Sequence, residues 1–261
     1  MIPNNFNVLQ RLVKGETSCC YLCEDIDTKQ KVVLKVIPQN KISRDVFEKE
    51  VEITKILSTE KCSSLVKIER TFSTKDSYII VMEPGQEDMF SYIKRHGTLS
   101  EKKARQYFYY IALALKFLHI RKIIHHDVKL ENIILMKDGK VKLIDFDFCE
   151  KLNNSSKSTV RRGTVKYTAP EILCMKPHTT KADIWSLGVT IFCAITDHFP
   201  FDGDNEYMYT MSVLSNPPDI LLLKEKKVSE DFISLIKIML EKDPEKRPSI
   251  EECLDFPWNV K

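Results

Sequence analysis

The sequence predicts an α+β protein in which a small sheet with one helix precedes a larger, mainly helical part. Short β-type runs dominate the N-terminal third, and the apolar spacing changes to a helical period only over 44–57. The segment Glu83–Gln86 contains Pro-Gly and marks a break, after which long helical patterns begin. We therefore expect a smaller unit at about 1–82, a connection at 83–87 and a larger unit at 88–261.

The smaller unit has four predicted strands and one predicted helix. The turn-like sequence Asp25–Thr28 separates the first two strands. In the helix, apolar residues recur every three or four positions, as on one face of an amphipathic helix. The strands are Cys20–Cys23, Lys31–Ile37, Leu65–Phe72 and Ser77–Met82, and the helix is Arg44–Leu57.

The larger unit is predicted to rest on three helices. Ser100 can cap a helix that runs through Leu118, although Lys103 denies it a capping box. The segment Ala182–Thr196 is almost entirely apolar and should be buried, whereas Phe232–Leu240 is amphipathic.

A β-hairpin is predicted between the first two of these helices. Short apolar runs at Ile133–Leu135 and Val141–Leu143 flank the dipeptide Asp138-Gly139. Asp-Gly is typical of a type I′ turn, and we expect that turn here.

Composition excludes several classes of protein. Apolar residues make up 43% and charged residues 30%, which is ordinary for a globular protein. The formal net charge of +3 is too small to indicate nucleic-acid or membrane binding. The N-terminus shows no signal pattern, and the apolar stretches at Ile111–Leu118 and Ile184–Ile195 are too short to span a bilayer. We expect a soluble, intracellular protein of the cytoplasm or nucleus.

The number and distribution of the cysteines agree with an intracellular protein. Eight are scattered along the chain, and without an export signal they are expected to be reduced thiols. The cluster Cys19, Cys20 and Cys23 lacks a second ligand pair at metal-binding spacing, so half-buried strand positions are favoured over a metal site.

One segment carries residue types suited to phosphoryl transfer. Such transfer needs a carboxylate to orient the attacking hydroxyl, oxygen ligands for magnesium and a cation near the moving charge. Asp127 can supply the first, Asn132 and Asp145 the second, and Lys129 the third. Each residue alone has an ordinary structural explanation; their order along the chain is what favours the functional one.

These residues resemble the catalytic loop and metal-binding triplet of eukaryotic-type protein kinases. Further motifs of that family follow in the expected order: Val32–Lys35, Glu50, Gly163-Thr164, Ala169–Glu171, Asp183–Gly188 and Arg247-Pro248. The resemblance covers nearly the whole chain. It implies a bilobal protein-kinase-like fold, with a small antiparallel sheet and one helix in the N-lobe and a mainly helical C-lobe, as a single catalytic domain over 1–261.

The resemblance also implies roles for individual residues. Asp127 and Lys129 would be catalytic, and Asn132 and Asp145 would bind Mg2+, or Mn2+ in its place. Structural roles fall to Thr164, Glu171, Asp183 and Arg247, with Glu171 and Arg247 forming a pair and Thr164 bridging Asp127 and Lys129. ATP would be bound by Val13, Gly15, Ser18, Cys20, Val33, Lys35, Glu50, Met82, Glu83, Pro84 and Ile134, with Lys35 paired to Glu50.

The glycine-rich loop departs from the family pattern. Val13, Gly15 and Ser18 occupy its three glycine positions, so only one glycine remains. Glycine allows close approach of the backbone to phosphate, and Val13 should restrict the turn. We expect ATP binding of reduced strength.

Two further departures concern the metal triplet and regulation. Asp147 replaces a glycine, which should reduce backbone freedom; the added carboxylate either helps to hold magnesium or faces solvent. His126 replaces the arginine that receives an activation-loop phosphate, and Val160, three residues before Gly163, cannot be phosphorylated. We therefore expect activity without loop phosphorylation.

Lys129 together with Thr164 resembles serine/threonine kinases rather than tyrosine kinases. Glu131 and Asp88 lie where relatives that prefer basic substrates keep acids, but Cys193 replaces another such acid. We expect protein substrates with basic residues near the target, and no membrane or nucleic-acid partner. The departures resemble those of baculoviral protein kinases, which would place the chain in an infected host cell. A catalytically weak pseudokinase scaffold and a small-molecule kinase are the alternatives.

Overall fold

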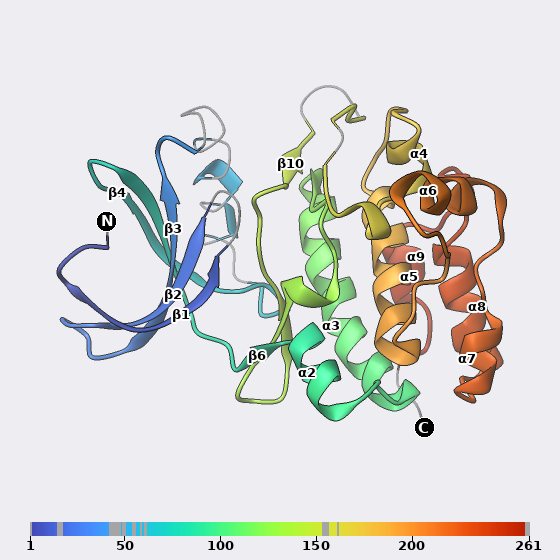
Figure 1. Cartoon of the computed structure of the whole chain (residues 1–261), viewed down its shortest axis with the longest axis horizontal. Coiled ribbons are helices and arrows are strands. Elements are labelled where there is room, and N and C mark those ends of the chain that lie inside the picture. Colours follow the sequence, from blue (N-terminus) through green and yellow to red (C-terminus); the bar gives the residue numbers. More distant parts are fainter. Residues whose placement is uncertain are drawn as a thin grey trace. The chain divides into compact units, whose positions relative to one another are not determined.

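The computed structural model describes residues 2–14, 18–41, 48, 51–53, 56–57, 59, 62–152, 157–160 and 162–258. The chain divides into two compact units, Met1–Gln86 and Glu87–Lys261 (Figure 1). The boundary falls inside the connection expected at 83–87. Each unit is described by itself below.

The first unit is built on an antiparallel five-stranded sheet with the order β1-β2-β3-β5-β4. All four predicted strands are confirmed, Ser77–Met82 with its predicted ends and the other three with shifted ends. The predicted turn is stabilised by Asp25, whose Oδ1 accepts from the backbone N–H groups of Asp27 and Thr28 at 3.0 and 3.1 Å. The strands are β1 (Phe6–Lys14), β2 (Cys19–Asp25), β3 (Lys31–Pro38), β4 (Ile68–Ser73) and β5 (Ser77–Met82).

Strand β1 is missing from the elements predicted by sequence. Its apolar residues do not alternate: Val8 and Leu9 are consecutive and both exposed. Two register shifts against β2 break the period that identifies a strand. Most of the predicted helix 44–57 lies outside the described residues, but Val51–Ile53 and Ile56–Leu57 are helical.

One face of this sheet carries the core of the first unit. Alternate residues of β3 and β5 share a face with Phe6 and Cys23, as the period of two requires. The buried residues of this cluster are Phe6, Cys23, Val32, Leu34, Val36, Ile79 and Val81.

The second unit is mainly helical and centres on α5. Every residue of α5 except its first is buried, which confirms the prediction for Ala182–Thr196. In Figure 1, α5 lies between α3 and α8, and it packs against both. The helices are α2 (Met89–His96), α3 (Glu101–Ile120), α4 (Pro170–Leu173), α5 (Lys181–Thr196), α6 (Glu206–Ser215), α7 (Leu221–Glu225), α8 (Glu230–Met239) and α9 (Ile250–Leu254).

The other two predicted helices are also confirmed. Ser100 caps α3, its side chain accepting from the backbone N–H of Lys103 at 3.4 Å, and Phe232–Leu240 corresponds to α8. None of the helices in the described part of the chain combines the length and apolar character that crossing a membrane would require.

Short strands and single helical turns surround these helices. β6, β8 and β9 form one small sheet, and β7 pairs with β10. These elements are β6 (Glu87–Asp88), β7 (Ile123–Ile124), η1 (Leu130–Asn132), β8 (Ile133–Leu135), β9 (Val141–Leu143), β10 (Glu150–Lys151) and η2 (Val165–Tyr167).

The hairpin β8–β9 is present, but the predicted type I′ turn is wrong. The backbone N–H of Gly139 donates to Met136 O at 3.0 Å, and that of Met136 donates to Lys140 O at 2.9 Å. Gly139 has a φ of 78°, whereas Asp138 is not among the described residues of positive φ. The loop is therefore an ordinary turn closed by a left-handed glycine, because its two strands are separated by more than two residues.

Candidate active site

The carboxylate of Asp127 is the centre of a hydrogen-bonded group in the second unit. Its Oδ1 accepts from the hydroxyl of Thr164 at 2.8 Å and from the backbone N–H of Thr164 at 3.1 Å. Its Oδ2 lies 2.7 Å from Lys129 Nζ and accepts from Asn132 Nδ2 at 2.9 Å. Four donors thus hold the carboxylate of a side chain that is only 2% exposed, which fixes its orientation.

Thr164 bridges Asp127 and Lys129, as the sequence predicted. Besides contacting Asp127, its Oγ1 accepts from Lys129 Nζ at 2.8 Å. Since Thr164 precedes η2 and the other two residues lie in the loop before η1, the bridge joins segments more than thirty positions apart.

We predict that Thr164→Ala lowers kcat roughly tenfold, because two hydrogen bonds to charged groups are lost. Thr164→Ser keeps the hydroxyl and should stay within about twofold of the unmodified protein. Initial rates of peptide phosphorylation measure both. Equal rates for the alanine and serine variants would contradict a role for the hydroxyl.

Asp183, at the start of α5, holds the backbone that precedes Asp127. Its Oδ2 accepts from the N–H of His125 at 2.8 Å, and its Oδ1 from the N–H of His126 at 2.9 Å. His119 Nε2 lies 2.8 Å from Oδ2. Burial opposes ionisation of Asp183, but the contact with His119 and the nearby histidines outweigh it and lower its pKa.

The hydrogen bonds to Asp183 hold this backbone in an unusual conformation. His126 has a φ of 68°, in the left-handed region that non-glycine residues seldom adopt. Gly163 packs against the same peptide: a Cβ at Gly163 would lie 2.3 Å from His126 O. Gly163 therefore allows the segment that carries Thr164 to reach the catalytic loop.

The two predicted metal ligands are tied together by the backbone. Ile144 N–H donates to Asn132 O at 2.9 Å, and Asp145 follows Ile144 directly. Asn132 uses its amide nitrogen on Asp127, donating to both its carbonyl and its carboxylate, which leaves the amide oxygen as a donor atom for a cation. Two hard oxygen ligands fit Mg2+, which completes its shell with water and substrate phosphates.

The residues around Asp145 are packed closely. Asp145 has a φ of 65°, and the buried ring of Phe146 meets the ring of His125 edge-on at 5.8 Å. Burial lowers the pKa of His125, so this imidazole is neutral at pH 7. Asp147 is half-buried and is not among the described residues of positive φ, which is why a Cβ is accommodated at this position.

The first unit carries most of the residues predicted to bind nucleotide. Cys20 lies opposite Lys35 in the register of β2 and β3, and Val33 lies opposite Met82 in that of β3 and β5. Because directly paired residues and alternate residues share a face, these four lie together on the face opposite the core cluster.

The remaining predicted nucleotide residues are placed as follows. Val13 belongs to β1, where its backbone is extended, so it does not restrict a turn at this position. Ser18 directly precedes β2. Glu83, which Pro84 follows, accepts from Lys67 N–H through Oε1 at 2.6 Å. In the second unit, Ile134 is half-buried in β8. The predictions for Gly15 and Glu50 lie outside the described residues.

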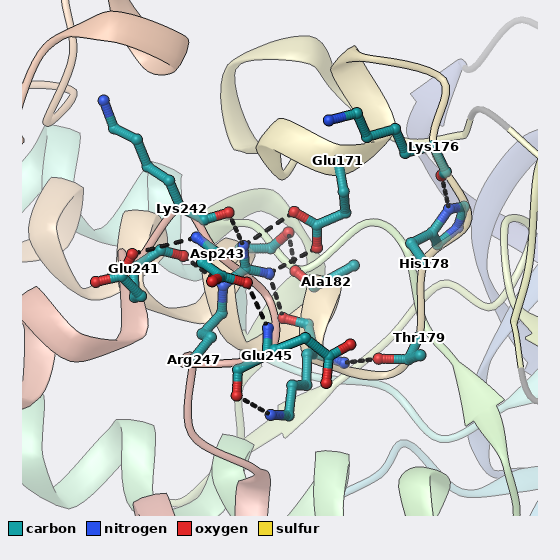
Figure 2. A network of polar contacts seen from close by, with 12 residues as sticks. Glu171, Lys176, His178, Thr179, Ala182, Glu241, Lys242, Asp243, Glu245 and Arg247 are labelled. Carbon is teal, nitrogen blue, oxygen red and sulfur yellow. Dashed lines mark hydrogen bonds and ion pairs between the residues drawn. The ribbon is translucent and has the colours of Figure 1, made fainter.

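Arg247 and Glu171 form a buried pair (Figure 2). Nη1 donates to Oε1 at 2.7 Å and Nη2 to Oε2 at 2.9 Å, a bidentate arrangement. The guanidinium also donates to the carbonyl oxygens of Glu241 and Lys181 at 2.8 and 2.9 Å. The pair ties α4 to the segment that precedes α9.

Sequence reasoning did not identify four polar residues around this site. His119 contacts Asp183, and Glu150, Ser158 and His178 gather beside His126. None of the four carries a local pattern, because their partners come from other segments of the chain.

A family model described as "Protein kinase domain" matches residues 6–259. The chain belongs to the protein kinase family. It is 31% identical to the Aurora kinase of Schizosaccharomyces pombe over 259 residues, 98% of this chain and 72% of that protein. It is also 31% identical to the human SNF-related serine/threonine-protein kinase over 261 residues, and to the mouse serine/threonine-protein kinase SIK1 over 258 residues. The chain spans only 34% and 32% of the latter two relatives.

The match identifies the two units as a protein kinase fold. The five-stranded antiparallel sheet and the helical unit are the α+β arrangement expected from the sequence. The human and mouse relatives are named as serine/threonine-protein kinases, in agreement with the choice indicated by Lys129 and Thr164.

Proposed function

We propose that this kinase domain transfers the γ-phosphoryl group of ATP to serine and threonine hydroxyls of proteins. The observation that carries the proposal is the contact group of Asp127, Lys129 and Thr164, with donor–acceptor distances of 2.7 to 2.8 Å. These contacts bring a base, a cation and a bridging hydroxyl within hydrogen-bond distance of one another. Transfer of this kind depends on positioning and on stabilisation of charge.

Each residue has an assigned step. The substrate hydroxyl oxygen attacks the γ-phosphorus, the bond from that phosphorus to the β-phosphate oxygen breaks, and ADP leaves. Asp127 orients the hydroxyl and takes its proton, while Lys129 stabilises the negative charge that spreads over the moving group. Asn132 and Asp145 would hold Mg2+, or Mn2+ in its place, which neutralises charge on the phosphates. Lys35 would contact the phosphates from the first unit.

A catalytically weak pseudokinase is not favoured. Lys35, Asp127, Asn132 and Asp145 are all present, and Asp147 is accommodated at a position that glycine fills in the family. The missing glycines at positions 13 and 18 are expected to weaken ATP binding without removing the catalytic groups.

Preference for basic residues near the target rests on Glu131. Its side chain is exposed, whereas the carboxylate of Asp88 caps α2, accepting from Ser91 N–H at 2.8 Å and from the Ser91 hydroxyl at 2.7 Å. Cys193 is buried, and burial raises its pKa, so it offers no charge to a substrate. Action in the cytoplasm or nucleus, and a viral source, stay predictions of the sequence.

A peptide-array screen with radiolabelled ATP tests the proposal. The expected result is label on serine and threonine peptides, little on tyrosine peptides, and loss of transfer when EDTA removes the divalent cation. Enrichment of basic residues upstream of the labelled site would support the role of Glu131, and Glu131→Gln should reduce that enrichment. Label confined to tyrosine, or transfer unaffected by EDTA, would contradict the proposed reaction.

A further inference from the structure

A polar cluster beside the catalytic loop takes no part in the chemistry described above. Its members are Glu150, Ser158, His126 and His178, which come from four separate segments of the second unit. The backbones of these segments are paired: Glu150 lies opposite Ile124 in β10–β7, and Ser158 forms an antiparallel bridge with His178. Ser158, His126 and His178 are buried.

The carboxylate of Glu150 contacts two other members of this cluster. Ser158 Oγ donates to Glu150 Oε2 at 2.6 Å, and His126 Nε2 lies 3.4 Å from the same oxygen. Ser158 Oγ in turn accepts from Val160 N–H at 3.1 Å. A single carboxylate oxygen therefore contacts both the catalytic loop and the segment 157–160.

The charge of this carboxylate is maintained by its surroundings. The imidazole of His126 outweighs partial burial and, with the Ser158 hydroxyl and the charge of Arg162, lowers the pKa of Glu150 to about 2. The contact of His126 Nε2 with Glu150 at 3.4 Å is an ion-pair contact without hydrogen-bond geometry, and within the described residues the ring nitrogens of His126 have no hydrogen-bond partner. Besides Glu150, the ring contacts the His178 ring, edge-on at 5.2 Å.

The position of Ser158 affects the catalytic residues, because Ser158 lies a few residues before Gly163 and Thr164 in the chain. Gly163 and Thr164 follow Ser158 within six residues, and both contact the catalytic loop: Gly163 at His126 O and Thr164 at Asp127. Holding Ser158 against Glu150 leaves only five residues between this anchored position and Thr164. Tethering of this kind lowers the entropy lost when Thr164 is ordered.

We propose that Glu150 is a positioning residue whose carboxylate fastens the segment 157–160 to the catalytic loop, so that catalysis needs no phosphate on that segment. This inference rests on the proposed function. A phosphate on Ser158 would face the charge of Glu150 at the distance of a hydrogen bond and would separate the segments rather than join them.

The test compares Glu150→Gln with the matched control Glu230→Gln, whose side chain is 79% exposed on α8. Both proteins are treated with phosphatase, and mass spectrometry verifies that no phosphate remains. Glu150→Gln should lower kcat roughly tenfold while KM for ATP stays unchanged, because a charge-assisted contact is lost outside the nucleotide face. The control should keep the kcat of the unmodified protein.

Hydrogen exchange supplies a readout that does not depend on activity. The amides of Ser158 and His178, which bond to each other's carbonyls at 2.8 and 2.9 Å, should exchange roughly tenfold faster in Glu150→Gln. Amides in the middle of α5 should not change. If Glu150→Gln does not fold, Ser158→Ala, which removes only the hydroxyl, must show the same local increase.

The possible results distinguish the proposed role of Glu150 from the proposed function of the domain. Unchanged exchange at Ser158 and His178, or a kcat for Glu150→Gln within about twofold of the unmodified protein, overturns the role of Glu150. Activity that appears only after phosphorylation of Ser158 or Thr159 overturns it as well. If neither form of the protein transfers phosphate, the proposed function is wrong, and hydrogen exchange alone decides whether Glu150 holds the segment.

Discussion

The Asp127→Asn substitution is expected to lower kcat for peptide phosphorylation by about 10²–10⁴-fold, the contribution typical of a positioned general base. The amide cannot take the proton of the substrate hydroxyl. It also has one acceptor oxygen, where the Asp127 carboxylate accepts from donors of Thr164, Lys129 and Asn132 with both of its oxygens. Whichever way the amide turns, its NH2 group meets other donors.

The measurement is the initial rate of transfer from radiolabelled ATP, made beside the free energy of unfolding in urea. Asp138→Asn is the matched control, because Asp138 lies in the exposed β8–β9 turn, where its carboxylate contacts the backbone and side chain of Lys140. It should keep full activity. Equal label from the unmodified protein and Asp127→Asn would mean that the activity belongs to a contaminating kinase, and the assignment of Asp127 would fall.

The Arg247→Met substitution is expected to reduce the free energy of unfolding by about 3–5 kcal/mol. It leaves the carboxylate of Glu171 buried without its bidentate partner, and it leaves the carbonyl of Glu241 without its side-chain donor. A buried charge without a partner costs far more than the pair contributes when it is complete. Urea unfolding measures the loss.

Two comparisons separate this cost from a general effect of losing arginine. Arg95→Met removes an ion pair with Glu87 at the surface, where the arginine side chain is 64% exposed, and should cost less than about 1 kcal/mol. The double substitution Glu171→Leu with Arg247→Met should recover part of the lost stability, because both charges are gone. A double variant as unstable as the sum of the single variants would contradict the interaction of the two charges.

Residues close together in the sequence allowed the catalytic loop to be predicted. Asp127, Lys129 and Asn132 lie within six positions, so their combination is visible without a fold. The long helices were predictable for the same reason: Ser100 caps α3 from its first turn, and α5 is apolar along almost its whole length. The β8–β9 hairpin was found from Asp138-Gly139, but its turn type was not, since that depends on how many residues separate the paired strands.

Other features depend on pairing between distant segments. Strand β1 lacks a clean alternation, and it is a strand because β2 pairs with it across two register shifts.

The sequence by itself determined the family and the helical framework, and it supplied the residues that we propose to move the phosphoryl group, because these depend on local spacing and residue type. The tertiary structure decided how they are held. The hydrogen bonds that Asp183 accepts from His125 and His126 span 58 and 57 positions, and Gly163 packs against His126, which lies 37 positions earlier in the chain. The junction of Glu150 with Ser158 and His126 likewise exists only after folding, since hydrogen bonds and burial between distant side chains leave no period in the sequence.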